Sequence, residues 1–334
     1  MKVDVDILGV SQTHHFIVSP RPDQQTITIE PVPRISIWEA AKVGDIDILN
    51  YFIRHHTNIP QEDDLMDETS ITRLLNSRDP NTECTLLHLI VSHNLNPLEP
   101  LRLLLEQGAD ATARNVYNVQ AIHALILKCP EPLESMKLLL EYDADPNARD
   151  GDGWTPAHYA ARFCKSPGPV LKALVEAGAD INAVDSSKKT ALFGLLANGD
   201  HSMTLDWLIH TVKANIKTRG DFLDGQTRRT KQGSLILQAA KYGRLSSLRI
   251  LISSASAMDS LETILTHDEL TLAIELVRQQ LVKVTERDKV ERLGLIIMIL
   301  ENMTQKLYAQ DNLPKQDNTS KSLLKRALSW RQNK

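Results

Sequence analysis

The sequence is short of the features that mark several common protein classes. It contains three cysteines, Cys84, Cys129 and Cys164, in 334 residues, which is too few and too scattered for a disulfide framework or a cysteine-rich zinc site. Aromatic residues make up only 4% of the chain, whereas leucine, isoleucine and alanine are plentiful. This composition favours packed helices over a β-sandwich.

Long apolar runs and a strong net charge are also missing. The longest apolar run, "LGLIIMIL" at 293–300, is far shorter than the roughly 20 residues that cross a bilayer, so we expect no membrane span. The opening "MKVDVDILGV" lacks the apolar core of a signal peptide, which favours a cytoplasmic or nuclear location. The formal net charge of −4 gives no general attraction to nucleic acids, so no direct nucleic-acid binding is expected.

What the sequence does contain is an internal repeat of fixed length. One landmark is a histidine, once replaced by phenylalanine, and the other is an alanine in a turn. Both recur every 35 residues, at His88, His123, His158 and Phe193 and at Ala109, Ala144, Ala179 and Ala214. Two landmarks in the same register argue against coincidence and predict an array of stacked repeats.

The segment Asp150–Ala183 indicates the structure of one repeat. Thr155 is a good helix N-cap and Pro156 suits the first helical turn, so "TPAHYAARF" opens a short helix. After a break in the proline-containing "SPGP", a second helix is predicted over Val170–Ala177, with Gly178 as its C-cap. A polar, extended segment then leads to the next helix. One such pair cannot bury its apolar face alone, so neighbouring pairs must stack.

On these residues the chain resembles the ankyrin-repeat family, whose unit of about 33 residues follows the pattern "DxxGxTPLHxAAxxG…LLxxGAdvNa". The repeat here is two residues longer, and the extra residues fall between the paired helices, where prolines cluster. Two degenerate helix pairs, Ser36–Ile53 and Gly233–Ile252, flank the four regular units. The resemblance implies an all-α ankyrin-repeat solenoid of about six repeats, with helix-turn-helix units joined by extended, β-hairpin-like loops.

The regions outside the repeats differ in character. We divide the chain into a β-rich or partly disordered segment at 1–34, an ankyrin-repeat domain at 35–254, a C-terminal helical cap at 260–310 and a disordered basic tail at 311–334. In the first segment, "VDVDI", "HHFIV" and "TITIE" predict two or three short strands that cap the first repeat. The helix predicted within 286–309 is apolar nearly all round. It either caps the stack or meets a second subunit.

The repeating histidine is interpreted as structural. A catalytic histidine needs an acid or a nucleophile at one unique place, whereas His158 recurs with the repeat and follows a threonine that can hydrogen-bond to it. In the family that the chain resembles, this histidine joins backbone groups of neighbouring loops. "DGDG" at 150–153 lacks the distal glutamate of a calcium loop, because Ala161 stands there. We therefore predict no catalytic residue, no cofactor, no metal site and no enzymatic activity.

Partner-binding residues follow from the resemblance. Ankyrin repeats bind other proteins through their loop tips and the exposed face of each first helix, which form a concave surface. Mapped onto this sequence, that surface includes Val116, Tyr117, Lys128, Asp150, Asp152, Trp154, Arg162, Phe163, Lys188 and Lys189. Aromatic and arginine side chains with mixed charges around them are typical of interface hot spots. For the tryptophan, packing against the adjacent loop is the alternative.

Three further segments carry individual features. An acidic insertion at 61–70 and a basic one at 217–231 are either partner contacts or solvated loops. In the tail, "KRALS" resembles the substrate motif of basophilic kinases, which makes Ser329 a candidate phosphorylation site.

Together these observations favour a non-catalytic protein-interaction module or scaffold. It would bind a partner protein through the concave surface and act as a monomer. The alternative is a regulatory or targeting subunit of a larger enzyme or transcription complex, assembled through its C-terminal helices. Self-association through 286–309 would accompany that alternative.

Overall fold

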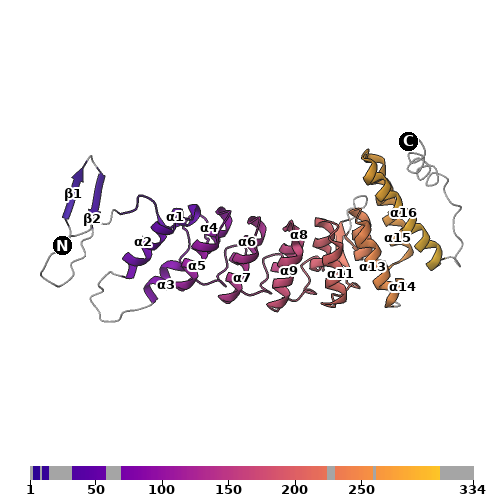
Figure 1. Cartoon of the computed structure of the whole chain (residues 1–334), viewed down its shortest axis with the longest axis horizontal. Coiled ribbons are helices and arrows are strands. Elements are labelled where there is room, and N and C mark those ends of the chain that lie inside the picture. The colour runs from indigo at the N-terminus through magenta and orange to yellow at the C-terminus, as the bar shows by residue number, and fades with distance from the viewer. Residues whose placement is uncertain are drawn as a thin grey trace. The chain divides into compact units, whose positions relative to one another are not determined.

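The computed structural model describes residues 3–7, 10–14, 32–57, 69–223, 230–258 and 261–308. The chain forms two compact units, Met1–Asp110 and Ala111–Lys334. In both units the described residues are mainly helical (Figure 1). The predicted all-α architecture of paired helices is confirmed.

The first unit contains a β-hairpin and two helix pairs. α1 packs on α4, and α2 contacts α5, so the first helices of the two pairs stack on one another and so do the second helices. α3 is an extra helix that contacts α2. The elements are β1 (Val3–Ile7), β2 (Val10–His14), α1 (Ile37–Val43), α2 (Ile46–Thr57), α3 (Thr69–Leu75), α4 (Leu86–His93) and α5 (Leu98–Glu106).

The N-terminal hairpin agrees only in part with the predicted strands. β1 is the predicted "VDVDI" strand, and it pairs antiparallel with β2 so that Val3 lies opposite His14. The second strand is therefore Val10–His14, whereas the sequence favoured "HHFIV" at 14–18. Of that stretch only His14 is described, and "TITIE" at 26–30 lies outside the described residues. The predicted acidic insertion lies mostly outside them too.

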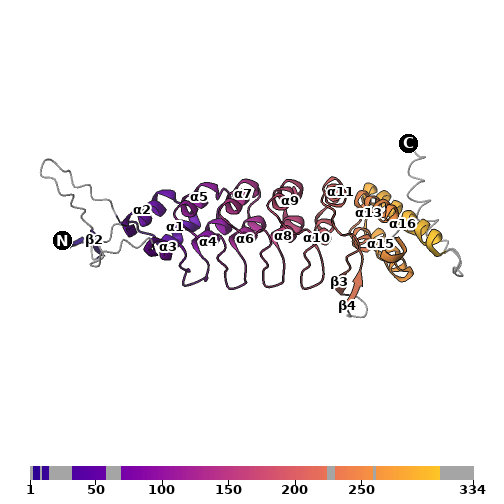
Figure 2. The same ribbon diagram turned by 90° about the horizontal axis from the view of Figure 1, so that it is seen from below.

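The second unit stacks its helices in two layers. The shorter first helices α6, α8, α10 and α12 form one layer, and α7, α9, α11 and α13 form the other, with the connecting loops projecting from one edge (Figure 2). The elements are α6 (Ala121–Lys128), α7 (Leu133–Glu141), α8 (Pro156–Phe163), α9 (Pro167–Glu176), α10 (Ala191–Asn198), α11 (Ser202–His210), β3 (Gly220–Leu223), β4 (Thr230–Gly233), α12 (Leu235–Lys241), α13 (Leu245–Ala257), α14 (Leu261–Ile264), α15 (His267–Lys283) and α16 (Arg287–Tyr308).

Small residues allow the first helices to pack closely. Ala160 and Ala161 are fully buried, and their helix α8 lies between α6 and α10. On α10, a Cβ atom built at Gly194 would lie 3.4 Å from the Cβ of Arg162. On α9, Leu171 and Leu174 are buried. The apolar surface of each pair is thus covered by its neighbours, which a single pair cannot achieve.

The second helix of the repeat begins earlier than predicted. α9 starts at Pro167, not at Val170, because Pro167 and Pro169 fit its first turn, where no intrahelical N–H bond is lost. Pro97 and Pro132 stand in the N-cap positions of α5 and α7. The clustered prolines therefore begin the second helices and do not simply lengthen the loop before them.

The last two helices pack on the repeats as a further pair. α15 lies against α12, α16 lies against α13, and α15 and α16 pack on each other. Ile296 and Leu300 of α16 are buried, whereas Met298 is 40% exposed. Within the described ranges, no helix combines the length and the hydrophobicity needed to span a membrane.

Candidate interaction surface

The loops that project from the second unit share one backbone design. We call them fingers: 112–120, 147–155, 182–190 and 217–234. In the first three fingers, one residue adopts a left-handed backbone conformation, two positions before the N-cap of the helix that follows (α6, α8 or α10). These residues are Asn118, Gly153 and Lys188, with φ of +60°, +79° and +59°. Each of these fingers is closed by a backbone hydrogen bond, from Asn115 N to Val119 O, from Asp150 N to Trp154 O and from Asp185 N to Lys189 O.

The fourth finger is a β-hairpin. It contains the surplus residues of the basic insertion, and β3 pairs antiparallel with β4 from Gly220 opposite Gly233 to Leu223 opposite Thr230. In Figure 2 it projects on the same side as the other fingers. The insertion therefore lengthens a finger and leaves the helix layers unchanged.

Neighbouring fingers are joined at their tips through main-chain atoms. These bonds hold successive tips next to one another, and side chains add the Ser186 hydroxyl bond to Asp152 O (2.6 Å) and the Lys188–Asp221 ion pair. The main-chain bonds run from Gly151 N to Tyr117 O (3.1 Å), from Ser186 N to Asp152 O (3.0 Å) and from Asp221 N to Ser187 O (2.7 Å).

The repeated histidines join each first helix to the next finger. Nδ1 of His158 accepts hydrogen bonds from the Thr155 hydroxyl (2.9 Å) and backbone N–H (3.2 Å), and Nε2–H donates to the carbonyl of Lys189 (3.0 Å). His123 donates in the same way to the carbonyl of Ala148 (2.9 Å). Burial lowers the pKa of both imidazoles, and one acceptor and one donor nitrogen define the neutral ring. The structural interpretation is confirmed for these two residues.

Arginines at the base of the fingers make a second set of connections, which the sequence analysis missed. Arg149 Nη1 donates to Gly153 O within its own finger (3.3 Å) and to Val184 O in the next (2.7 Å). Arg114 donates likewise to Asn118 O (2.9 Å) and to Arg149 O (2.7 Å). The two arginines are 35 residues apart, so the period itself was a signal for them.

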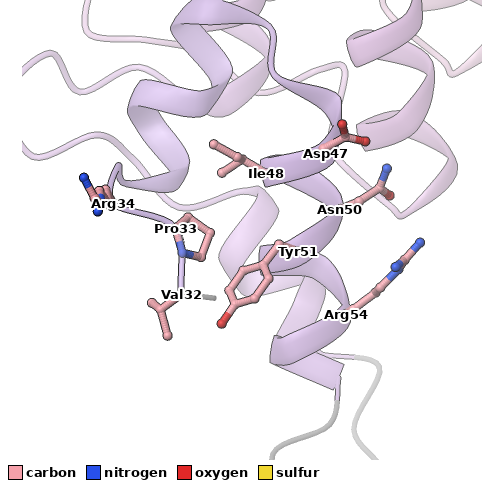
Figure 3. A pocket seen from close by; sticks show the side chains of 8 residues that line it. All are labelled: Val32, Pro33, Arg34, Asp47, Ile48, Asn50, Tyr51 and Arg54. Carbon is pink, nitrogen blue, oxygen red and sulfur yellow. The ribbon is translucent and has the colours of Figure 1, made fainter. Parts of the chain in front are cut away.

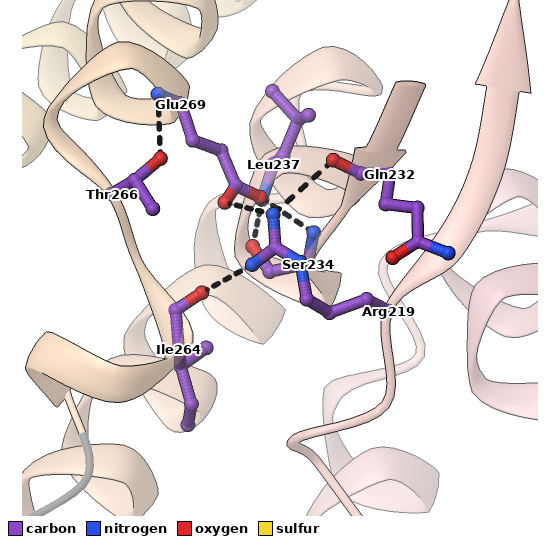
Figure 4. A network of polar contacts seen from close by, with 7 residues as sticks. All are labelled: Arg219, Gln232, Ser234, Leu237, Ile264, Thr266 and Glu269. Atoms are coloured by element: carbon purple, nitrogen blue, oxygen red, sulfur yellow. Dashed lines mark hydrogen bonds and ion pairs between the residues drawn. The ribbon is translucent and has the colours of Figure 1, made fainter. Parts of the chain in front are cut away.

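The same position in the last finger joins the repeats to α15. Arg219, 70 residues after Arg149, donates to Gln232 O in its own finger (3.2 Å) and to Ile264 O beyond it (2.8 Å). Its guanidinium also pairs with the Glu269 carboxylate at 2.8 Å. The glutamate side chain is only 3% exposed and accepts a further bond from Ser234 N. Figure 4 shows the guanidinium between these acceptors.

An aromatic cluster lies where the second finger meets α8. The Trp154 ring stacks on Phe163 with 5.9 Å between centroids and meets the edge of Tyr159 at 5.6 Å. The Tyr159 hydroxyl donates to the Asp150 carboxylate at 2.7 Å. Burial, and next the bond to this carboxylate, raises the pKa of Tyr159. Phe163 is 45% exposed, so the outer part of the cluster faces solvent.

Some of the predicted partner-binding residues are exposed to solvent, and others make contacts within the chain. Val116 and Tyr117 lie at a finger tip, where Tyr117 is 74% exposed, and Lys128 and Asp152 are also exposed. Trp154 and Arg162 are half-buried, with the guanidinium carbon 5.5 Å from the centroid of Phe163.

Of the other four, Phe163 is exposed, and Asp150, Lys188 and Lys189 have contacts within the chain. The Asp150 carboxylate accepts from the backbone N–H groups of Asp152 and Trp154 as well as from the tyrosine hydroxyl. Lys188 pairs with Asp221 at 3.8 Å, and Lys189 offers its carbonyl to the histidine. Ser329 lies outside the described residues.

A hollow of about 510 Å³ lies in the first unit, between the approach to α1 and the exposed side of α2. Figure 3 shows its lining, with Arg34 and Arg54 at opposite sides and the Tyr51 ring beside Val32 and Pro33. The lining contains no cysteine, histidine or serine.

The described side chains hold no group of three or more histidine, cysteine, aspartate or glutamate residues placed to bind a metal ion. Cys164 is buried, which raises its pKa to about 11. A thiol in this state is a poor nucleophile.

One comparison with known proteins identifies the repeats. The family model for ankyrin repeats in three copies matches residues 87–185 and, in an overlapping second match, residues 123–219. Together the two matches cover residues 87–219, which include the landmarks His88, His123, His158 and Phe193 and the first three fingers. No curated protein sequence matches the chain.

Proposed function

Because this chain is an ankyrin-repeat protein, we propose that it is a non-catalytic interaction module or scaffold that binds a partner protein on the concave surface of its second unit. Ankyrin repeats are in general protein-interaction modules. The observation that carries the proposal is the exposed aromatic cluster beside finger tips that are joined through their backbones. A surface ordered in advance loses little entropy on association.

The proposed contact residues are the exposed ones among the predicted set. Tyr117 and Phe163 offer large apolar areas, and aromatic side chains often dominate binding energy. The Asp150 carboxylate accepts hydrogen bonds from Trp154 N and the Tyr159 hydroxyl. We propose that it contributes to binding by holding these two residues in position. The division of the chain into four regions and its cytoplasmic or nuclear location are kept as predictions.

The alternative is a regulatory or targeting subunit that assembles through α15 and α16. Val282 and Met298 of this pair are 80% and 40% exposed, and apolar side chains at such positions suit a subunit contact. Gel filtration tests this alternative directly. A concentration-dependent dimer that the Met298→Lys variant abolishes would favour it, whereas a monomer at all concentrations would contradict it.

The main proposal is tested by partner capture with a matched control. The variant Tyr117→Ser with Phe163→Ser removes two exposed aromatic side chains from the concave side. The control Tyr142→Ser with Met203→Ser removes two exposed apolar side chains from the second-helix layer, where they are 37% and 86% exposed. We expect cross-linked partners to be lost from the first variant and kept by the second. Equal capture by both would contradict the proposal.

A further inference from the structure

The aromatic cluster of Trp154, Tyr159 and Phe163 is flanked by two helices that carry small residues at the position equivalent to Tyr159. Tyr159 and Phe163 contact Trp154 of a finger, so their helix positions face the finger side. At the 35-residue equivalents of Tyr159, α6 presents Ala124 and α10 presents Gly194. Neither neighbouring helix therefore carries an aromatic side chain at this position.

Three bases lie near the C-terminal ends of the helices that form this part of the surface. Lys128, Arg162 and Lys165 lie at or just beyond the C-terminal ends of α6 and α8, and Lys128 and Lys165 are exposed. Within the described part of the chain, none of these three bases has an ion pair. The Arg162 guanidinium lies against Phe163, which leaves its N–H donors available for a carboxylate.

Most acids on the same side are already engaged. The Asp150 carboxylate accepts three hydrogen bonds, and Asp185 is buried and accepts from the backbone of its own finger. Asp221 pairs with Lys188. Asp152 and Glu131 remain as exposed acids. On the side of the aromatic cluster, three unpaired bases thus stand against two exposed acids, whereas the whole chain has a net charge of −4.

The helix dipole does not account for this distribution of charge. Bases are favoured at helix C-termini, which would explain Lys128 and Arg162 in the last turns of α6 and α8. However, the second helices α7 and α9 end in Glu141 and Glu176, the opposite of what the dipole favours. The second helices also carry the bases Lys137 and Lys172, but these pair with Glu134 and Glu176, whereas Lys128 and Arg162 of the first helices form no ion pair within the described residues.

We propose that the concave surface of the second unit binds an acidic peptide segment of its partner that carries an aromatic or large aliphatic side chain. This inference rests on the proposed function. The apolar side chain packs against Trp154 and Phe163, and flanking carboxylates pair with Lys128, Arg162 and Lys165. A nucleic acid is the less suitable anion, because it would require a dense basic stripe, whereas this surface combines few bases with exposed apolar rings.

A displayed library of random peptides, selected on the full-length chain, tests the chemistry of the partner. We expect the selected sequences to combine several carboxylates with one aromatic or large aliphatic residue, and to lose binding to the Phe163→Ser variant. Selection of basic or neutral sequences that still require Phe163 would overturn the acidic partner but leave the proposed function intact. A selection that yields no Phe163-dependent sequence would remove both.

Charge-reversal variants then test the role of the bases. A fluorescent twelve-residue peptide with six glutamates and one phenylalanine serves as the probe, with anisotropy as the readout. Lys128→Glu with Lys165→Glu should weaken binding about tenfold or more. The control, Lys137→Glu with Lys172→Glu, makes the same change of charge on the second-helix layer and should stay within about twofold.

Two comparison ligands complete the test. The same peptide with serine in place of phenylalanine should bind more weakly, and one with lysine in place of glutamate should not bind measurably. Equal weakening by the two charge-reversal variants would show a general charge effect and overturn the site. Tighter binding of a single-stranded oligonucleotide than of the acidic peptide would overturn the choice of a protein partner.

Discussion

The junction between α8 and α10 and the junction between α12 and α15 connect neighbouring helix pairs by different chemistry. In the first, the buried neutral imidazole of His158 joins Thr155 to the carbonyl of Lys189. In the second, the buried carboxylate of Glu269 joins Ser234 N to the guanidinium of Arg219. One junction is uncharged, and the other depends on an ion pair that is largely removed from water.

The two junctions nevertheless share a plan. Thr155 is the N-cap of α8 with His158 three residues later, and Thr266 is the N-cap of α15 with Glu269 three residues later. Arg149 and Arg219 each bond within their own finger and to the following unit. The C-terminal pair is therefore attached by the rules of the repeat, although its sequence no longer follows the repeat pattern. The threonine N-cap with a polar side chain three residues later is thus still present at α15, where a glutamate has taken the place of the histidine.

The largest effect is expected at the charged junction. Glu269→Ala leaves the Arg219 guanidinium and Ser234 N–H without their acceptor, and it should lower the free energy of unfolding by about 3 kcal/mol. Urea denaturation followed by circular dichroism measures this loss. The control Glu275→Ala, on the exposed side of the same helix, should change stability by less than about 0.5 kcal/mol. Equal effects would mean that the ion pair does not hold the junction.

The neutral junction should respond somewhat less strongly. His158→Ala removes the bond to Lys189 O and leaves the Thr155 hydroxyl without a partner, which should cost about 2 kcal/mol. The exposed His93 provides the control, since His93→Ala should be nearly neutral. The denaturation midpoints of both variants decide the matter, and a loss as large for His93 as for His158 would refute the bridging role.

A pair of threonines sharpens the comparison through the sign of the effect. Thr190 corresponds to Thr155, but Phe193 replaces the histidine there, and the buried Thr190 hydroxyl has no hydrogen-bond partner among the described residues. Thr155→Val should destabilise the protein by about 1 kcal/mol, whereas Thr190→Val should be neutral or stabilise it by up to about 1 kcal/mol. Thermal unfolding of the two variants gives the signs. A loss of the same size in both would show that the histidine bond is unimportant.

The smallest effect is a pH dependence that belongs to the neutral junctions. Burial lowers the pKa of His123 and His158 below the ordinary value of 6.5, so the unfolded chain takes up protons first as the pH falls. The contribution of these residues to stability is complete above pH 6.5 and is lost progressively below it.

Urea midpoints at pH 7.5 and 5.5 measure this loss. In the double variant His123→Phe with His158→Phe, which copies the residue found at Phe193, the midpoint should fall less on acidification than in the unsubstituted protein. An unchanged difference between the two pH values would assign the acid sensitivity to other groups.

Contacts that recur from one repeat to the next could be predicted from the sequence. His158 could be interpreted because its threonine lies three residues away and because the pattern recurs, and the start of α8 followed from Thr155 and Pro156. The arginines at 114, 149 and 219 were missed although their spacing is a multiple of the period. An arginine in a polar loop is usually solvated, and only the folded fingers show that its carbonyl acceptors lie within reach.

Other features could not be predicted because they depend on packing between distant segments. Glu269 and Arg219 are 50 residues apart, and nothing local indicates that they meet. Asp150 was placed on the binding surface by its position in the finger, whereas its carboxylate is directed to Tyr159 and to the finger backbone. A repeat pattern gives the location of a residue within its unit, but the direction of a polar side chain depends on which donors the fold brings near.

The tips of the fingers are tied by peptide groups such as Gly151 N–H and the Tyr117 carbonyl. Substituting a tip side chain leaves these bonds in place, so recognition can diverge between related proteins while the spacing of the display stays constant. An engineer could exchange the residues at 116, 117 and 152 for a new specificity without redesigning the scaffold beneath them.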